Sequence, residues 1–400
     1  MASSKWKTFQ EINEIVSKRK FVYWGASNWI ERSQCEIKKK PLFIVDKSSL
    51  NQGTVYQNLK VYDPIKIKSE NNLYIVITTA NFNSVIQELE DLGLVMGDDF
   101  CCTPLLNQRQ SIEDIQHNDS KILITSPQHF NDKKTGGGLY EVHSSSGEYK
   151  KLYSGKARGI TKGHENFYLV DMMRGVVVLD KNFKEINLFS LPKNSEPHGI
   201  CYNDKNKEIF VGCPGRDSII SLSIDNGICK DEYFISNKWK SNKKDNHHVN
   251  DPLVIGDSLY VSMFSVSGNW MNEIYDGAIV EFNLENKENF VVVVHNLSMP
   301  HSIYKINGKL TFLNSMFGQL FHGSYDNLFE CDGFARGLAY DNKYFYIGVT
   351  EHRYPEKIFS QKKHASLDVG IHVFDPKAKI SKFIPCSFIN SIHSIIINND

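Results

Sequence analysis

The sequence predicts two domains: a small α/β domain over residues 1–110 and, after a linker over residues 111–120, a large all-β domain over residues 121–400. In the first 110 residues, segments with a helical hydrophobic period alternate with segments that read as strands. From about Lys121 the helical period disappears, and short β-rich runs are separated by Gly, Asn and Asp turns. A repeat within this second part predicts its architecture.

Three apolar segments of the first domain have the character of buried strands, at residues 21–24, 41–45 and 73–77. They alternate with two helical patterns, KTFQEINEIVSKR and residues 83–92. In the second pattern the apolar residues recur on one helical face. This alternation predicts a parallel sheet covered by helices, a Rossmann-like arrangement.

The first strand of this domain ends in a Gly-containing turn, Trp24-Gly25-Ala26-Ser27-Asn28. Gly25, Ser27 and Asn28 are candidate cofactor-binding residues, because such a turn brings backbone amides to a phosphate at a helix start. Asp46, at the end of the second strand, is a candidate partner for a ribose hydroxyl. The turn lacks the full GxGxxG pattern, so a domain that binds no ligand is the alternative.

A longer motif order accompanies the turn, with FIVDKSSLNQGTVYQNLKVYDP followed by IVITTAN and LEDLGLVMGDDF. It resembles the small nucleotide-sugar-binding domain at the front of sialic-acid-type and bacillosamine-type acetyltransferases, over about the first 105 residues. The resemblance implies a nucleotide or nucleotide sugar as the ligand. No acetyltransferase hexapeptide repeat follows.

The all-β domain contains a repeating unit that starts with Arg or His and continues through a strand and a turn into a second strand. Six starts recur 35 to 57 residues apart, at Arg158, His198, His248, His301, Arg336 and His393. The sixth unit is cut short by the C-terminus, whereas the domain begins with strands that lack a first strand of their own. The two ends complete each other, which predicts a six-bladed β-propeller closed by the C-terminal strand.

The first strand of each propeller blade lines the central channel, so the six starting residues are predicted to converge on one axis. We take all six, together with Glu351, as candidate catalytic residues. His198, His248 and His301 lie on consecutive blades and are also candidate ligands of a divalent metal ion, with Asn250, Asp251 or Glu351 as oxygen ligands. Arg158 and Arg336 favour a carboxylate or phosphate. The alternative is that these side chains tie blade loops together by hydrogen bonds.

Further polar side chains follow the second strands and are expected at the same face of the propeller: Asp171, Arg174, Asn314, Glu351, His352 and Arg353. Glu351 or a ring histidine is a candidate general base, and a solvated loop is the alternative. Trp270 and Tyr275, in the insertion SVSGNWMNEIYDG, are expected to stack on a sugar ring or to cap the channel.

Motif order also connects the C-terminal half to known proteins. HHVNDPLVIGDSLYVS, MPHSIYKINGKLTFLNSMFGQLF, GFARGLAYDNKYFYIGVTEHR and DVGIHVFDP together resemble an uncharacterised family of bacterial six-bladed propellers of unknown function, over residues 246–383. PHGI, at residues 197–200, is loosely similar to streptogramin-lyase-type propellers. That second resemblance implies a channel histidine and a divalent metal that serve an elimination reaction.

Composition and charge indicate which classes of partner and which compartment to expect. The 46 basic and 46 acidic residues give no net charge, so nucleic acid and anionic membranes are not expected partners. No apolar run approaches the roughly 18 residues of a membrane span, and the start has no apolar signal core, which predicts a cytoplasmic protein without membrane insertion. Eight cysteines without a CxxC pair predict buried, reduced thiols.

Together these features predict an enzyme of surface-polysaccharide or sugar metabolism. Its substrate would be a small anion of carbohydrate type, a sugar acid or a nucleotide sugar, bound in the channel. Elimination, isomerisation or hydrolysis would be assisted by His and Arg side chains and a metal ion. The alternative is a non-catalytic propeller that binds a glycan or a protein, with a front domain that senses a nucleotide sugar. The oligomeric state is left open.

Overall fold

The computed structural model describes residues 5–127, 137–285, 290–323, 325–352, 354–358 and 362–399. The chain divides into two compact units, Met1–Asp114 and Ile115–Asp400. α4 (Asn107–Gln116) is helical across part of the segment predicted as a linker.

The small unit contains one six-stranded sheet in the order β3-β4-β2-β1-β5-β6. Its strands are β1 (Lys20–Trp24), β2 (Ile44–Val45), β3 (Val55–Tyr56), β4 (Leu59–Tyr62), β5 (Leu73–Ile77) and β6 (Phe100–Cys102). β1, β2, β4, β5 and β6 are parallel, and β3 pairs antiparallel to β4. The sheet is therefore mixed but mainly parallel, and its parallel strands stand in the chain order third, second, first, fourth, fifth.

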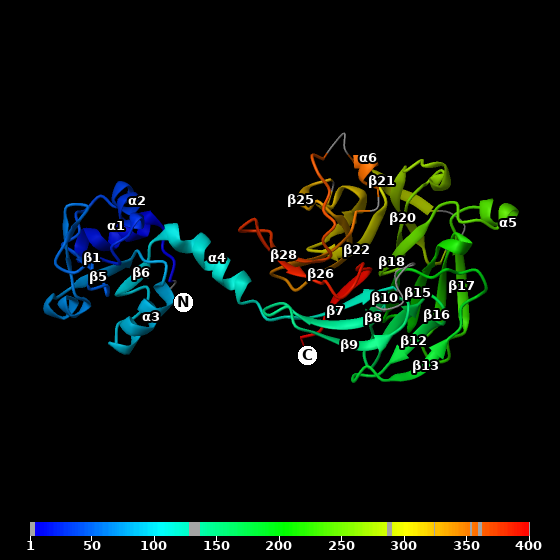
Figure 1. Cartoon of the computed structure of the whole chain (residues 1–400), viewed down its shortest axis with the longest axis horizontal. Helices are drawn as coiled ribbons and strands as arrows, with labels where there is room; N and C mark the ends of the chain where they lie inside the picture. Colours follow the sequence, from blue (N-terminus) through cyan, green and yellow to red (C-terminus); the bar gives the residue numbers. More distant parts are fainter. Residues whose placement is uncertain are drawn as a thin grey trace. The chain divides into compact units, whose positions relative to one another are not determined.

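Helices cover both faces of this sheet (Figure 1). α1 (Phe9–Lys18), which begins in a capping box of Thr8 and Glu11, and α2 (Asn28–Glu36) pack on one face through Ile12, Val16 and Ile30. α3 (Phe82–Asp91) packs on the other through Phe82, Val85 and Leu89. Alternate strand residues enter the two cores, which explains why the strands are apolar without interruption. The predicted helices and strands are confirmed, although the second strand is limited to two residues.

The large unit is a six-bladed β-propeller, as predicted, built from six four-stranded antiparallel sheets. Four blades are β10 (Ala157–Lys162), β11 (Phe167–Asp171), β12 (Gly175–Leu179), β13 (Glu185–Phe189); β14 (Ile200–Asn203), β15 (Glu208–Cys213), β16 (Ser218–Ser223), β17 (Cys229–Phe234); β18 (Val249–Ile255), β19 (Ser258–Met263), β20 (Gly277–Asn283), β21 (Phe290–Leu297); and β22 (Pro300–Ile306), β23 (Lys309–Asn314), β24 (Gln319–His322), β25 (Asn327–Glu330). A fifth is β26 (Phe334–Tyr340), β27 (Phe345–Thr350), β28 (Gly370–Asp375), β29 (Ile380–Pro385).

The sixth blade joins the two ends of this unit. It combines the C-terminal β30 (Ser394–Ile397) with β7 (Lys121–Ser126), β8 (Gly138–His143) and β9 (Tyr149–Ser154). β30 pairs antiparallel with β7, so the red C-terminal strand closes the ring beside the start of the unit (Figure 1). This pairing removes the exposed sheet edge that an open ring would leave. The predicted closure is confirmed.

First strands form the inner wall of the propeller. β10, β14, β18, β22, β26 and β30 contact their neighbours in turn, and β30 contacts β10 again. The middle strands are apolar and buried, whereas outermost strands such as β13 carry exposed side chains. Residues at the beginning of each first strand therefore come from six different blades and meet around one axis.

Two short helices, α5 (Lys238–Asn242) and α6 (Pro355–Ile358), lie in connections of the propeller. Among the described residues, no helix is long and apolar enough to cross a membrane. All eight cysteines are free thiols, and six of them are buried as predicted, whereas Cys35 and Cys229 are exposed. Burial raises the pKa of Cys201 and Cys213 to about 12, which keeps both as thiols.

Candidate functional site

The predicted ring of blade-start residues lies on or just before the first strands. Arg158 is on β10, His301 on β22 and Arg336 on β26, while His198, His248 and His393 lie within two residues of β14, β18 and β30. The electrostatic surroundings of His198 show that these residues lie close together. The charges of four residues from four other blades lower the pKa of His198: Arg158, His248, Arg336 and His393. Burial is the largest cause, and the pKa of His198 lies well below its usual range.

Arg158 and His198 form the first pair of the ring. Nη1 of Arg158 lies 2.8 Å from Nε2 and 2.9 Å from Nδ1 of His198. The Glu196 carbonyl oxygen, 3.0 Å from Nδ1, is an acceptor only. Nδ1 of the neutral imidazole therefore donates to Glu196, and Nε2 accepts from the guanidinium of Arg158. The pair carries one positive charge.

Arg336 and His393 form a second pair of the same kind, with Nη1 of Arg336 3.3 Å from Nε2 of His393. Both side chains are buried. Asp251 lies within the electrostatic reach of Arg336, which opposes the rise in the pKa of Asp251 that burial causes. The carboxylate of Asp251 accepts a hydrogen bond from the Ser302 amide at 2.7 Å. The guanidinium groups of Arg158 and Arg336 are the positive charges of this ring, and the carboxylate of Asp251 offsets part of them.

His248 is hydrogen-bonded to Asp245, three residues earlier in the chain. Oδ2 of Asp245 lies 2.5 Å from Nδ1 of His248, and Oδ1 accepts the backbone N–H of His248 at 2.9 Å. His248 has a φ of +50°, a left-handed conformation that a non-glycine residue adopts at a cost. The ring packs against Trp270 and Phe264, with centroids 4.5 Å and 4.4 Å away. Nδ1 is thus held by a carboxylate, and the opposite nitrogen, Nε2, is the one available for proton transfer.

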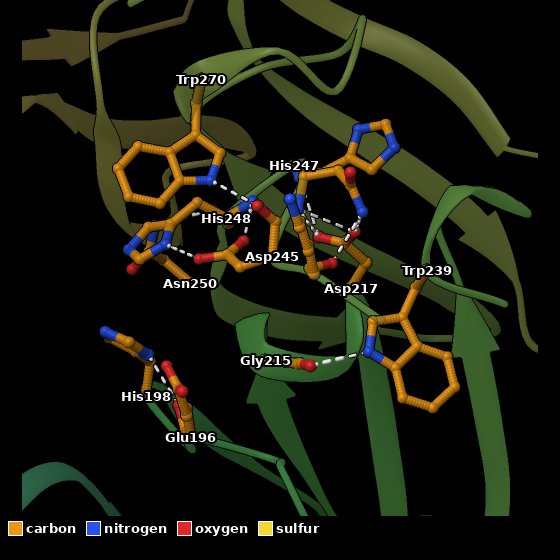
Figure 2. Close-up of polar contacts among 12 residues, drawn as sticks. Glu196, His198, Gly215, Asp217, Trp239, Asp245, His247, His248, Asn250 and Trp270 are labelled. Atoms are coloured by element: carbon orange, nitrogen blue, oxygen red, sulfur yellow. Dashed lines mark hydrogen bonds and ion pairs between the residues drawn. The ribbon is translucent and has the colours of Figure 1, made fainter. Parts of the chain in front are cut away.

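A buried carboxylate, Asp217, holds the turn that carries the hydrogen-bonded pair of Asp245 and His248 (Figure 2). Asp217 is fully buried and accepts hydrogen bonds from the backbone N–H groups of Asn246 and His247 and from the Asn246 amide, at 2.7–3.0 Å. Burial raises the pKa of Asp217, and these donors lower it. His247 is anchored in turn by Ser236 Oγ and the Ser265 carbonyl, both at 2.8 Å. The turn from Asp245 to His248 is therefore rigidly placed against the neighbouring blade.

The three predicted metal-binding histidines do not form one ligand set. The rings of His198 and His248 lie edge to face with centroids 5.1 Å apart. Phe264 contacts both His248 and His301, and Nδ1 of His301 lies 2.8 Å from Ser315 Oγ and 3.0 Å from the Met299 carbonyl.

Nη1 of Arg158 also lies 2.8 Å from Nε2 of His198, so a metal ion bound to this nitrogen would meet the positive charge of the guanidinium. Across the part of the chain that the structure describes, no group of three or more His, Cys, Asp and Glu side chains has metal-binding geometry. These residues do not fit a divalent ion, because Arg158 opposes it by charge and Phe264 contacts both other ligands.

The predicted second layer consists largely of residues engaged elsewhere. Arg174 is exposed and pairs with Glu185 on the outermost strand of its blade at 2.6 Å. Asp171 accepts from Tyr153 Oη at 2.8 Å, and Asn314 accepts from the Ser298 amide at 2.7 Å. These three side chains therefore bind partners outside the channel ring.

The Glu351-His352-Arg353 cluster is divided. His352 is buried and bonds the Met316 carbonyl at 2.8 Å, whereas Glu351 is exposed. Arg353 lies outside the described residues. Trp270 donates to the Asp245 carbonyl at 3.1 Å and, with Tyr275, packs in an apolar cluster around Phe264. The insertion therefore covers the hydrogen-bonded pair of Asp245 and His248.

In the small unit, residues in and beside the predicted cofactor-binding turn already pack against one another and form hydrogen bonds with one another. Gly25 has φ +106° and lies so close to Thr79 that a Cβ would meet the Thr79 side chain at 2.6 Å. Ser27 caps α2, whose first residue is Asn28, by accepting the Trp29 N–H. Asp46 accepts the Ala26 N–H at 2.7 Å and the Ser48 N–H at 2.8 Å. A carboxylate thus already holds an amide of the turn, and binding of a phosphate there stays a prediction.

Sequence reasoning missed Asp245 and Asp217. Asp245 carried a local signal, since it precedes His248 by three residues in DNHH. Asp217 belongs to another blade and carried none.

Comparison with known proteins places the propeller among structures of similar fold. Residues 233–396 match a family described as a domain of unknown function, DUF4915. No curated protein matches the sequence. A protein of unknown function from Bacteroides caccae has a TM-score of 0.50 at 10% identity, covering 70% of this chain and 100% of that one.

A nidogen/laminin complex also has a TM-score of 0.50 at 10% identity, over 69% and 98% of the two chains. The virginiamycin B lyase of Staphylococcus aureus has a TM-score of 0.38 at 14% identity, over 53% and 70%. At these identities the likenesses concern the fold alone. The predicted resemblance of the C-terminal half to a propeller family of unknown function agrees with the matched domain, and the resemblance of the front domain to acetyltransferase-type proteins stays a prediction.

Proposed function

We propose that the propeller channel binds a small anion of carbohydrate type, a sugar acid or a nucleotide sugar, and that His248 transfers a proton in its conversion. The observation that carries the proposal is the joint presence, on one axis, of two Arg–His pairs and one Asp–His pair. The guanidinium groups of Arg158 and Arg336 supply donors and positive charge for a carboxylate or phosphate. Because their partner histidines accept their hydrogen bonds, neither pair cancels this charge.

Asp245 prepares His248 as a general base. The carboxylate accepts from Nδ1, which fixes the tautomer with a lone pair on Nε2 and stabilises the imidazolium that forms when Nε2 takes a proton. In an elimination or isomerisation the electron pair of the broken bond to hydrogen stays on the substrate, where the guanidinium groups stabilise the negative charge. The proton then returns to the substrate or leaves with its departing group, so His248 ends neutral. No step requires a metal ion.

The test separates binding from chemistry. Isothermal titration calorimetry against sugar acids and nucleotide sugars should detect a ligand that Arg336→Ala and Arg158→Ala each weaken at least about tenfold, the expected effect of losing a charged hydrogen bond. Arg174→Ala is the matched control, since Arg174 is exposed and pairs with Glu185. Its affinity should equal that of the wild type.

Proton transfer is followed by NMR of the bound ligand in D₂O, through product formation or exchange of a carbon-bound hydrogen. His248→Gln should abolish both, and Asp245→Asn should slow them by about 10² or more while binding persists. Binding without any exchange or product would favour the alternative, a non-catalytic glycan-binding propeller. Absence of binding to any anion of the panel would refute the proposal.

A nucleotide-sugar-sensing role of the small unit is proposed separately, on its mainly parallel sheet and its Gly25 turn. Titration of the full chain with nucleotide sugars, with Asp46→Ala as the variant, tests it.

A further inference from the structure

Asn250 is a fully buried polar residue beside the Asp245–His248 pair. It lies on β18, two residues after His248, and Figure 2 shows it directly below His248, toward His198. Nδ2 of Asn250 donates to the carbonyl oxygen of His248 at 3.0 Å. Because a carbonyl accepts only, this bond determines which end of the amide is nitrogen. The other end, Oδ1, has no hydrogen-bond partner within the described part of the propeller.

The backbone of Asn250 is tightly packed, so it has little freedom to shift and bring Oδ1 to a donor. Its carbonyl oxygen accepts the Gly199 amide at 3.1 Å from the neighbouring blade. A Cβ at Gly212 would lie 2.0 Å from the same oxygen, so the two blades touch backbone to backbone at this point. A buried acceptor that lacks a donor destabilises the folded chain, whereas an apolar residue of the same size would not. Asn250 therefore needs an explanation beyond packing.

The chemistry of the surrounding groups specifies what reaches Oδ1. Oδ1 accepts only, so its partner must be a donor. An ammonium group is disfavoured by the guanidinium groups of Arg158 and Arg336 on the same axis. The remaining donors of a small organic anion are neutral O–H and N–H groups, and the hydroxyl is the one that every sugar acid carries.

We infer that Asn250 Oδ1 accepts a hydrogen bond from a hydroxyl group of the anionic ligand, so that the channel selects a hydroxylated carboxylate over a plain carboxylate of equal length. The inference rests on the proposed function and gives it a substrate class. Asn250 is the specificity-determining residue, and the two arginines hold the carboxylate.

The experiment compares D-gluconate with hexanoate, two six-carbon carboxylates of which only the first bears hydroxyl groups. Calorimetric titration of the wild-type chain should show gluconate bound at least about tenfold more tightly, the effect of one hydrogen bond to a buried acceptor. Asn250→Leu should remove most of this preference by weakening gluconate and leaving hexanoate unchanged. Asn203→Leu is the matched control, because Asn203 is also buried with one amide atom lacking a partner, but ends β14 at the hairpin to β15.

The outcomes keep the two proposals apart. If both carboxylates bind the wild type equally well, the anion site stands and the inference is overturned, with a bound water as the partner of Oδ1. The same holds if Asn250→Leu keeps the preference. If neither these carboxylates nor any other anion binds, the proposed function itself fails. The wild-type comparison needs no variant, so it decides the matter even where Asn250→Leu does not fold.

Discussion

Replacing Asp217 with Asn is the sharpest test of how the turn from Asp245 to His248 is held. The variant keeps the size of the side chain, and Asn tolerates the left-handed conformation of this position, where φ is +48°. Only the charge and one acceptor oxygen are lost. Stability should therefore report the hydrogen bonds of the carboxylate rather than a change in packing.

The expected loss follows from the contacts. The two carboxylate oxygens serve the Asn246 N–H at 2.9 and 3.0 Å, the Asn246 amide at 2.7 Å and the His247 N–H at 2.8 Å. With one oxygen replaced by NH₂, either orientation deprives the Asn246 amide or the His247 N–H of this acceptor and buries a new donor. One charge-assisted bond and one unpaired donor together cost about 3 kcal/mol. For a unit of this size that corresponds to about 6 °C in the melting temperature.

Differential scanning calorimetry of the full chain measures this loss in the transition of larger enthalpy, which belongs to the larger unit. Asp180→Asn is the matched control. One oxygen of Asp180 accepts the amides of Asn182 and Lys184 at 2.9 and 2.8 Å, and Asn can keep that oxygen. The control should shift the transition by less than about 2 °C. A shift for Asp217→Asn as small as that of the control would refute the reasoning.

Three further predictions concern the rest of the molecule. Lowering the pH from 7 to 5 should reduce the melting temperature of the propeller. The unfolded chain takes up a proton on His198 near pH 6.5, whereas burial and Arg158 hold the pKa of His198 in the folded state well below that value. The stability that neutral His198 contributes is present above pH 6.5 and is lost as the pH falls below that value. His198→Gln should therefore make the melting temperature depend less on pH, and an unchanged slope would contradict this prediction. Deleting residues 392–400 removes β30 and exposes the edge of β7, so size-exclusion chromatography should show aggregates; a monomer with unchanged melting would contradict the closure. Gly25→Ala should lower the free energy of unfolding of the small unit by about 2 kcal/mol or more, because the new Cβ meets Thr79 and residue 25 has a positive φ. Only the calorimetric transition of smaller enthalpy should move to a lower temperature; a shift of the larger transition instead would refute this.

The propeller was predictable because its signal is local and repeated. Each blade contributes an Arg or His start, a strand, a turn and a second strand, and six copies define the ring without knowledge of any long-range contact. The incomplete first and last copies predicted the pairing of β30 with β7, which joins residues far apart in the chain. In the small unit the alternation of helical and strand periods predicted its helices and its mainly parallel sheet.

The site was predictable only in its position. Repeat alignment placed Arg158, His198 and Arg336 on the axis, but not their pairing with one another or with His393. The three histidines predicted as a metal set do not come together in the structure, because His301 turns to Ser315 and the Met299 carbonyl while Phe264 contacts both His301 and His248. Side-chain direction depends on rotamers and neighbours that periodicity does not contain.

The sequence by itself determined the six blades, their closure and the residues that begin each inner strand, because hydrophobic period and turn chemistry act over a few residues. Only the tertiary structure decided which nitrogen of each histidine is held, that Asp217 of one blade fixes the Asp245–His248 turn of the next, and that Asn250 keeps a buried acceptor beside it. The Asp217 contacts join two blades and groups 29 and 30 residues apart, and hydrogen bonds across such distances leave no pattern in the chain. The contacts of His198 with Glu196 and of His248 with Asp245 are local, but they depend on side-chain directions that packing decides.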